Sequence, residues 1–73
     1  MTWYVKRTDN DGVSNPRYLA EDGTWVLLKA NAYAFDYEAI CQVTKKAADT
    51  VMAITRALDG QSPPNPYNFS VVT

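Results

Sequence analysis

The chain has no histidine, one cysteine and three glycines, and each shortage excludes a class of site. One thiol cannot form an intrachain disulfide, and without histidine it cannot complete a zinc site. The missing imidazole also leaves any serine or cysteine nucleophile without its usual base. The three glycines are isolated from one another and form no phosphate-binding loop. We therefore expect no enzymatic activity, no metal and no other cofactor.

A basic excess and long apolar runs are also missing. Seven basic residues face eight acidic ones, for a net charge of -1, whereas a general binder of phosphate backbones needs a clear positive excess. No run of about 18 apolar residues could span a membrane. The opening "MTWYVKR" lacks the apolar centre of a signal peptide. Together with the lone thiol, these features favour a cytoplasmic location.

The composition is that of one small globular domain. Of the 73 residues, 47% are hydrophobic and 21% are charged, which is an ordinary globular balance. A chain of this length buries little surface, and no disulfide or zinc site helps it. A compact core, or a partner, must stabilise the fold.

The first half of the chain predicts three strands. Residues 2–7 alternate, with Trp3, Val5 and Arg7 on one side and Tyr4 and Lys6 on the other. The turn-rich segment "TDNDGVSNP" then forms a loop. The second and third strands cover residues 17–20 and 24–28. They are joined by a tight turn at "DG", because glycine adopts positive φ without steric cost.

A helix is predicted to begin at Tyr37. Asp36 precedes it as an N-cap whose carboxylate can accept a bond from a first-turn amide. Phe35 and Ile40 have the spacing of a hydrophobic staple, and Glu38 suits the positive end of the helix dipole.

The end of this helix has two interpretations. Apolar residues in steps of three and four favour one helix to Leu58, with Gly60 as its C-terminal stop. These residues are Ile40, Val43, Ala47, Val51, Ile54 and Leu58. However, the segment is β-branched, and a helix of about 12 residues, about 18 Å long, would match the strands better than one of about 22 residues. We therefore predict a helix followed by a fourth strand over residues 50–57.

The composition changes after Gly60. Residues 61–73 contain three prolines and little to pack, so we expect a disordered tail that is polyproline-like at Pro63-Pro64. The predicted fold is a single α+β domain over residues 1–60. It has a small antiparallel sheet of three to four strands in the order β-β-β-α-β, one helix packed on the sheet, and a flexible C-terminal tail.

Two acidic segments and the thiol are candidate sites. Glu21 and Asp22 are adjacent carboxylates, but they lie at a solvated hairpin tip and are explained by turn formation. "DNDG" begins like a calcium-binding loop, yet its glycine falls at the fourth position and Ala20 occupies the twelfth. Cys41 has no histidine to activate it and is interpreted as a structural thiol.

Aromatic residues are concentrated in the first half, and one helix cannot hide all of them. Exposed aromatic rings beside arginine are typical of protein interfaces. The candidate partner-binding residues are Trp3, Tyr4, Lys6, Arg7 and, with weaker support, Trp25. The alternatives are that these residues pack in the core, or that the rings stack on single-stranded nucleic acid, which the net charge disfavours.

Over residues 2–58, the order "WYVKR…RYL…DGTWV…A.AFDYEA" resembles a small domain frequent in phage and bacterial proteins. In that domain a strand, a hairpin with "DG.W", an "A..F" segment and a capped helix are often closed by a last strand. The resemblance implies a fold rather than an activity.

In length and layout the chain also resembles small phage-encoded proteins that bind host RNA polymerase. That resemblance implies a monomer that binds a large polymerase subunit in the host cytoplasm, without direct contact to nucleic acid or membrane. It would inhibit promoter initiation and promote readthrough of terminators. The alternatives are a nucleic-acid-binding module, an inhibitor of a different host enzyme, and a virion or scaffold component.

Overall fold

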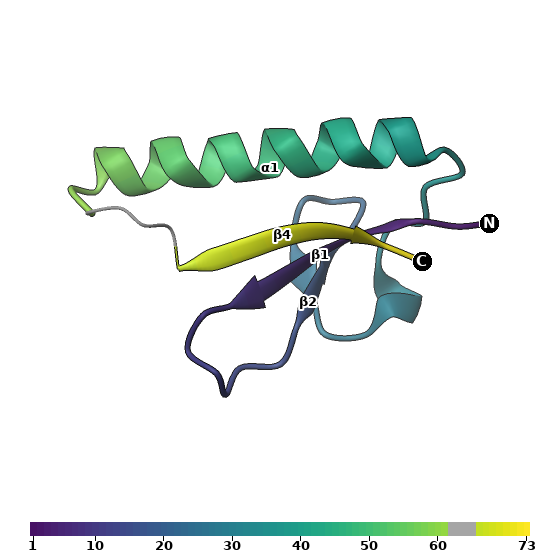
Figure 1. The fold of residues 1–73 in the computed structure, drawn as a ribbon, viewed down its shortest axis with the longest axis horizontal. Coiled ribbons are helices and arrows are strands. Elements are labelled where there is room, and N and C mark those ends of the chain that lie inside the picture. The colour runs from purple at the N-terminus through teal and green to yellow at the C-terminus, as the bar shows by residue number, and fades with distance from the viewer. Residues whose placement is uncertain (62–65) are drawn as a thin grey trace.

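One helix crosses one face of a four-stranded antiparallel sheet (Figure 1). The computed structural model describes residues 1–61 and 66–73. The strands lie in the order β3-β2-β1-β4, so the first strand is central and the last is at an edge. The elements are β1 (Tyr4–Asp9), β2 (Arg17–Leu19), β3 (Trp25–Val26), the short 3-10 helix η1 (Lys29–Asn31), α1 (Glu38–Leu58) and β4 (Tyr67–Val72). The α+β class and the order β-β-β-α-β are confirmed.

Strand β1 organises the sheet because it pairs on both sides. It pairs with β2 at Lys6–Tyr18, and with β4 from Tyr4–Val72 to Asp9–Tyr67. It begins and ends two residues later than the sequence predicted. Trp3 instead forms an isolated bridge in which its amide and carbonyl bond Phe35, at 3.0 and 2.9 Å.

The turn between β2 and β3 has the predicted chemistry. Gly23 has φ of +86°, a backbone region that costs other residues strain. The Asp22 carboxylate accepts bonds from the Thr24 amide at 3.1 Å and the Thr24 hydroxyl at 2.6 Å. Strand β3, which follows this turn, covers Trp25–Val26 and is shorter than the predicted range of residues 24–28.

The start of α1 differs from the prediction. The helix begins at Glu38, and the extended residue before it is Tyr37, with φ of -125° and ψ of 126° and no side-chain capping bond. Asp36 therefore lies one residue too early to cap the helix. Ile40 is 56% exposed while Phe35 is buried in the core, so the predicted staple does not secure this end.

The prediction of a strand over residues 50–57 is wrong, because α1 continues to Leu58. Gly60, with φ of +75°, ends it as the alternative interpretation expected. Its amide bonds the Ala57 carbonyl at 3.1 Å and the Gln61 amide bonds the Arg56 carbonyl at 2.8 Å, which is the Schellman pattern. The β-branched Thr50 fits in the helix because its hydroxyl donates to the Lys46 carbonyl at 2.9 Å.

The prediction of a disordered tail is wrong for Tyr67–Val72, which form β4 along the full length of β1. The sequence "YNFSVV" is rich in β-forming residues, and a central strand was available to pair with it. The fourth strand thus exists, but after the prolines rather than before them. The polyproline-like Pro63-Pro64 lies outside the described residues.

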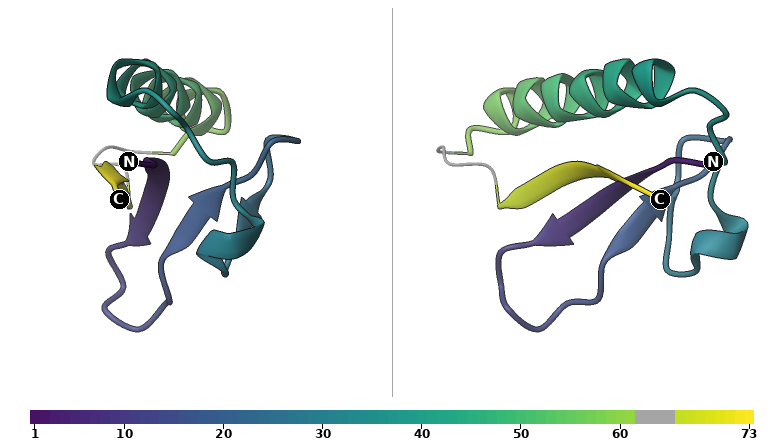
Figure 2. Two further views of the ribbon diagram at one scale, coloured as in Figure 1. Left: turned by 90° about the vertical axis from the view of Figure 1, so that its right-hand side faces the viewer. Right: turned by 45° about the vertical axis from the view of Figure 1, so that its right-hand side comes forward.

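The core between helix and sheet is small. Of the described residues, Val5, Phe35 and Cys41 are the buried hydrophobic ones, with Trp3, Leu19, Trp25 and Val71 partly buried around them. Burial, and secondarily the nearby Glu38 carboxylate, raises the pKa of the Cys41 thiol. Helix α1 packs mainly on β1 and β4, so the β2–β3 hairpin extends beyond its side (Figure 2).

Candidate protein-binding surface

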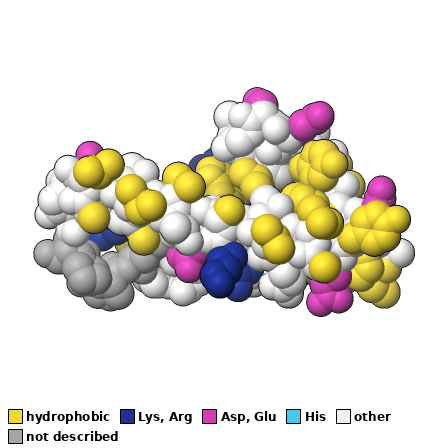
Figure 3. Space-filling view, turned by 90° about the horizontal axis from the view of Figure 1, so that it is seen from above, with side chains coloured by type: hydrophobic (Ala, Val, Ile, Leu, Met, Phe, Trp, Pro, Cys, Tyr) yellow, Lys and Arg dark blue, Asp and Glu magenta, His cyan; other side chains and the backbone are white. Residues whose placement is uncertain are grey.

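Helix α1 exposes a line of apolar side chains along its whole length. We call this line the helix stripe: Ile40, Val43, Ala47, Val51, Ile54 and Leu58. Its five large side chains are between 55% and 83% exposed. Seen from above, apolar side chains follow the helix from end to end (Figure 3). The spacing of these residues was the basis of the alternative interpretation, one helix to Leu58, and the structure places their side chains outside the core.

The helix turns a different face to the sheet. Cys41 is fully buried, and at about 100° per residue Ala48 and Met52 lie within about 20° of it around the helix axis. Val51 is then about 80° from Cys41, and Ile54 about 140°. The stripe therefore points partly sideways and partly away from the sheet. The sequence could not reveal this rotation, because both faces are apolar.

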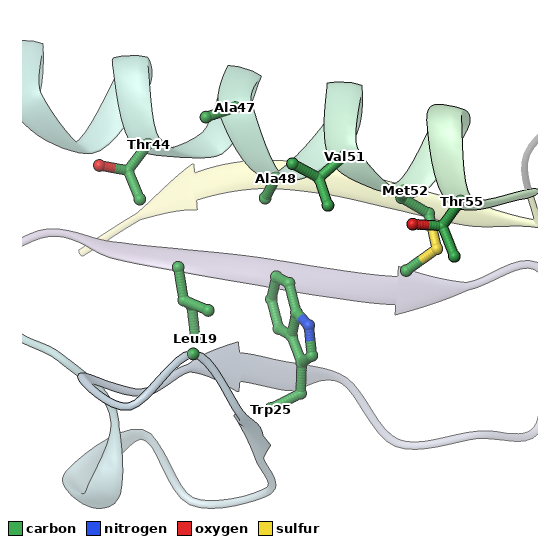
Figure 4. Close-up of a pocket in the computed structure, with 9 residues that line it drawn as sticks. Leu19, Trp25, Thr44, Ala47, Ala48, Val51, Met52 and Thr55 are labelled. Carbon is green, nitrogen blue, oxygen red and sulfur yellow. The ribbon is translucent and has the colours of Figure 1, made fainter.

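An apolar groove separates α1 from the β2–β3 hairpin (Figure 4). Its volume is about 320 Å³. Leu19 and Trp25 rise from the hairpin towards the helix, while Ala48, Val51 and Met52 point down from α1. Thr44 also lines the groove, and its hydroxyl donates to the Ile40 carbonyl at 2.9 Å. Because that hydroxyl is satisfied within the helix, it adds little polarity to the groove wall.

The five candidate partner-binding residues are divided between the two faces of the sheet. Trp3 and Trp25 pack against the core on the helix side. Arg7 lies on the same face of β1 as Val5, towards the helix, whereas Tyr4 and Lys6 project from the opposite face. The structure therefore does not bring the five together as one surface.

Arg7 is held inside the fold. Its guanidinium carbon lies 4.6 Å from the centre of the Tyr67 ring and 5.2 Å from that of Trp25. Its Nε lies 3.4 Å from the Asp9 carboxylate, an ion pair without the alignment of a hydrogen bond, and the side chain is 13% exposed. Trp25 also contacts Phe69, with ring centres 5.5 Å apart. Arg7 and Trp25 thus support the sheet.

The face of the sheet away from α1 carries aromatic and basic side chains. One row crosses all four strands as Val26, Tyr18, Lys6 and Ser70. A second position pairs Tyr4 with Val72. We call these six residues the open sheet face. The helix lies on the other side of the sheet (Figure 2).

Lys29 adds a second positive charge at the end of this face. Its Nζ lies 5.4 Å from the centre of the Tyr4 ring and donates to the Thr73 carbonyl at 3.0 Å. The sequence selected Tyr4 and Lys6 as partner-binding residues, left the direction of the Tyr18 ring open, and did not point to Lys29. The positions of Tyr18 and Lys29 depend on strand register and on η1, which the sequence pattern did not specify.

Strand β4 borders the open sheet face and forms one edge of the sheet. Among the described strands it has a neighbour, β1, on one side only. Its sequence "YNFSVV" contains no charge and no proline, the residues that usually discourage pairing at an edge. The outer backbone groups of β4 are therefore suited to hydrogen bonding with another extended segment.

The acidic segments behave as turns. Bonds from the Thr24 hydroxyl and amide lower the pKa of Asp22. Bonds from the hydroxyl and amide of Ser14, and from the amide of Val13, lower the pKa of Asp11 to about 2. Both carboxylates are engaged within their own loops. No group of three or more potential metal-ligating residues occurs among residues 1–61 and 66–73.

Searches for related proteins supply no further assignment. No family model, no curated protein and no solved structure matches the chain. In the part of the chain that the structure describes, no helix combines the length and apolarity needed to cross a bilayer.

Proposed function

We propose that this chain is a non-enzymatic, phage-type protein that binds a host protein in the host cytoplasm through its open sheet face. The observation that carries the proposal is the combination of Tyr4, Tyr18 and Lys6, all half-buried, on the sheet face opposite α1. Tyrosines beside a cation form typical interface contacts, since an aromatic ring supplies apolar area and a polar end.

The neighbouring edge supplies a binding mode. An extended segment of the partner adds to β4 and receives backbone hydrogen bonds along "YNFSVV". Its side chains alternate across the extended sheet, so every second one lies on the side of Val72 and Tyr4. Lys6 and Lys29 favour acidic side chains in that segment.

The proposed partner is a large subunit of bacterial RNA polymerase, as the resemblance to polymerase-binding phage proteins implies. Occupation of the polymerase surface would inhibit promoter initiation and promote readthrough of terminators. This assignment rests on the resemblance, while the open sheet face supports protein binding in general.

A pull-down from bacterial lysate with the tagged chain tests the partner. Recovery of the large polymerase subunits is expected, followed by inhibition of promoter-dependent transcription and increased readthrough with purified polymerase. Recovery of a different enzyme instead would indicate the inhibitor alternative. Enrichment in purified virions without polymerase binding would indicate a structural component. Either result would overturn the polymerase assignment.

The open sheet face also supports a second candidate function, binding of single-stranded nucleic acid. Tyr4 and Tyr18 could stack bases while Lys6 and Lys29 contact phosphates. The net charge of -1 counts against it. A salt titration with single-stranded DNA and RNA decides: affinity that falls steeply with salt supports this function, and no binding at low salt removes it.

A further inference from the structure

We infer that β4 pairs with β4 of a second copy of this chain, which joins the two four-stranded sheets into one continuous antiparallel sheet. The two-fold axis passes beside Phe69, perpendicular to the sheet, so both α1 helices lie on the same face. The resemblance to polymerase-binding proteins implied a monomer, whereas this edge of the sheet supports a weak dimer. Dimer formation needs no host protein, but a second copy and a host segment cannot occupy β4 together.

The backbone of β4 presents its outward hydrogen-bonding groups at alternate residues. The Asn10 amide bonds the Pro66 carbonyl at 2.8 Å, and the β1–β4 pairs continue from there in unbroken register. In an antiparallel ladder, residues that bond the neighbouring strand alternate with residues whose amides and carbonyls point away from it. The even-numbered residues of β4 therefore bond β1. The backbone groups of Tyr67, Phe69 and Val71 point away from β1, towards the edge.

These outward residues match one another under a two-fold axis. An antiparallel strand centred at position 69 sets Phe69 opposite Phe69 of the second copy. Val71 then lies opposite Tyr67 of the second copy, because the two residues are equally far from position 69. Directly opposite residues of this kind exchange a pair of backbone hydrogen bonds. A two-fold interface requires such a self-matching surface, and the register centred at 69 uses the whole of β4.

The sequence of β4 lacks the features that keep exposed edges apart. Its residues include no charge and no proline, and its register with β1 contains no bulge. Natural proteins use these devices to prevent pairing between sheet edges. The opposite edge, β3, covers only Trp25–Val26. Among the described strands, β4 is therefore the edge that is long enough and open enough to extend the sheet.

A line of alternating charges follows α1 on the side of β4. We call it the charge row: Glu38, Lys45, Asp49 and Arg56. At about 100° per residue, all four lie about 40–80° around the helix axis from the sheet-facing Cys41, on the opposite side from Val51 and the groove. Because the β2–β3 hairpin and β4 are at opposite edges of the sheet, the charge row lies towards β4. Charged side chains gather along this side of the helix, away from the hairpin (Figure 3).

The charge row complements itself when two helices run antiparallel. Its spacings are seven, four and seven residues, and its signs alternate along the helix. Reversal about position 47 therefore sets Lys45 opposite Asp49 of the second copy, and Glu38 opposite Arg56 of the second copy. Both facing pairs have opposite charges. This electrostatic complementarity of the chain with itself favours a second copy as the occupant of the edge.

The strand and the charge row indicate the same axis. Val71 packs against the core that contains Cys41, and β4 runs opposite to α1 (Figure 1). Two strand residues, about 6.6 Å, correspond to about four helix residues, so Phe69 lies level with about position 45. Phe69 also contacts Trp25, which lies below Ala48 in the groove (Figure 4). Position 47, the centre of the charge row, falls between these two levels.

The two charge rows come within reach of each other in this arrangement. Helix α1 packs on β1 and β4, and neighbouring strands lie about 4.8 Å apart. A helix above these strands is about 5–7 Å from the two-fold axis, so the two α1 helices are about 10–14 Å apart. That separation slightly exceeds the roughly 8–10 Å of helices in direct contact. The long side chain of Lys45 can bridge the difference to Asp49 of the second copy.

The proposed interface is small and leaves the rest of the molecule uncovered. The two hairpins lie at the outer ends of the joined sheet, so neither chain obstructs the groove or the open sheet face of the other. One strand and one flank of a helix bury less than the about 800 Å² per partner of a standard interface. We therefore expect a dimer that dissociates in the micromolar to millimolar range.

Sedimentation equilibrium of the purified chain from micromolar to millimolar concentrations gives the first test. The mass is expected to rise from 8.2 kDa towards twice that value. No host protein is present, so this result is separate from that of the pull-down. A mass of 8.2 kDa at every concentration would overturn the dimer.

Two double variants of β4 test the register. Pairing centred at 69 sets Asn68 opposite Ser70 of the second copy, and both residues are exposed. Asn68→Glu with Ser70→Glu places like charges at both contacts and should weaken the dimer at least about fivefold. Asn68→Lys with Ser70→Glu places opposite charges there and should dimerise at least as well as the wild type. Both lose the bond from Asn68 to Asn10 equally, and circular dichroism checks that both are folded. Equal dimerisation of the two would contradict this register.

Charge reversal on α1 tests the helix contact. Lys45→Glu sets a like charge opposite Asp49 of the second copy and should raise the dissociation constant about threefold or more. Adding Asp49→Lys restores opposite charges and should recover the dimer. Lys46→Glu makes the same change one residue outside the charge row and should leave dimerisation unchanged. Equal loss in Lys45→Glu and Lys46→Glu, or no recovery in the double variant, would overturn the placement of the helices about the two-fold axis.

Discussion

The guanidinium of Arg7 lies between two aromatic rings, 5.2 Å from the centre of Trp25 on β3 and 4.6 Å from that of Tyr67 on β4. These strands are the two edges of the sheet, and Arg7 is on the central strand. One side chain therefore links three of the four strands on the helix side. This explains why a residue that resembles an interface hot spot in the sequence is part of the structural framework.

Substitution of Arg7 should destabilise the fold. Arg7→Ala removes both ring contacts and the packing of the aliphatic stem, so we expect a loss of about 1–2 kcal/mol in the free energy of unfolding. Arg7→Lys keeps the charge but not the planar group, and should lose less. Asp9→Asn is the control, because it removes only the ion pair and should cost at most about 0.5 kcal/mol. Urea unfolding followed by circular dichroism measures all three, and equal stability of Arg7→Ala and wild type would exclude this role.

The C-terminal stop of α1 depends on the backbone of Gly60. No heavy atom lies within 4 Å of a Cβ built on it, so a substitution acts through its φ of +75° alone. Gly60→Ala should cost about 1 kcal/mol, which lowers the melting temperature of a domain this size by about 4–8 °C. Gly60→Asn should lose less, because asparagine tolerates this region better. A higher melting temperature for Gly60→Ala than for Gly60→Asn would contradict the role of Gly60 as the C-terminal stop of α1.

The loop after β1 should titrate at unusually low pH. The pKa of Asp11 is lowered from 3.8 to about 2, with the Ser14 hydroxyl as the largest cause. A depressed folded-state pKa means that the loop bonds contribute fully above pH 3.8 and are lost as the pH falls towards 2. Ser14→Ala should therefore raise the pKa of Asp11 towards 3.8.

Carbonyl carbon NMR during an acid titration measures this shift. Asp22 is the internal control, because Thr24 lowers its pKa and Ser14 does not. The pKa of Asp22 should be the same in the wild type and in Ser14→Ala. An Asp11 signal that titrates at 3.8 in the wild type would show that the Ser14 bonds do not form.

Local sequence patterns predicted which segments form helices and strands better than they predicted how those segments pair and pack. Alternation in residues 2–7 gave the correct faces for Tyr4 and Val5, and "DG" gave the turn at Gly23. Periodicity gave a helix ending before Gly60. The preference for a strand over residues 50–57 assumed that a helix must not extend past the sheet. In the structure Ile54 and Leu58 are exposed because they lie on a side of α1 that does not face the sheet, so they need no strand to cover them.

The part of the candidate site that the sequence did not predict depends on pairing between segments far apart in the chain. Prolines near residue 64 suggested a tail, whereas Tyr67–Val72 pair with a strand about sixty residues earlier. No local signal specifies such a contact. The rotation of α1 was equally hidden, because Cys41, Ala48 and Met52 on one side and the helix stripe on another are both apolar. The sequence thus indicated that aromatic residues would be exposed, but not which ones share a face.

Binding of purified bacterial RNA polymerase to the wild type and to two charge-reversal variants tests the central claim most directly. Lys6→Glu changes the open sheet face, while Lys46→Glu makes the same change on the exposed surface of α1. The proposed function predicts that polymerase binds the wild type and Lys46→Glu with similar affinity and binds Lys6→Glu at least about tenfold more weakly, a difference of about 1.4 kcal/mol. Failure of polymerase to bind the wild type, or equal binding to both variants, would contradict it.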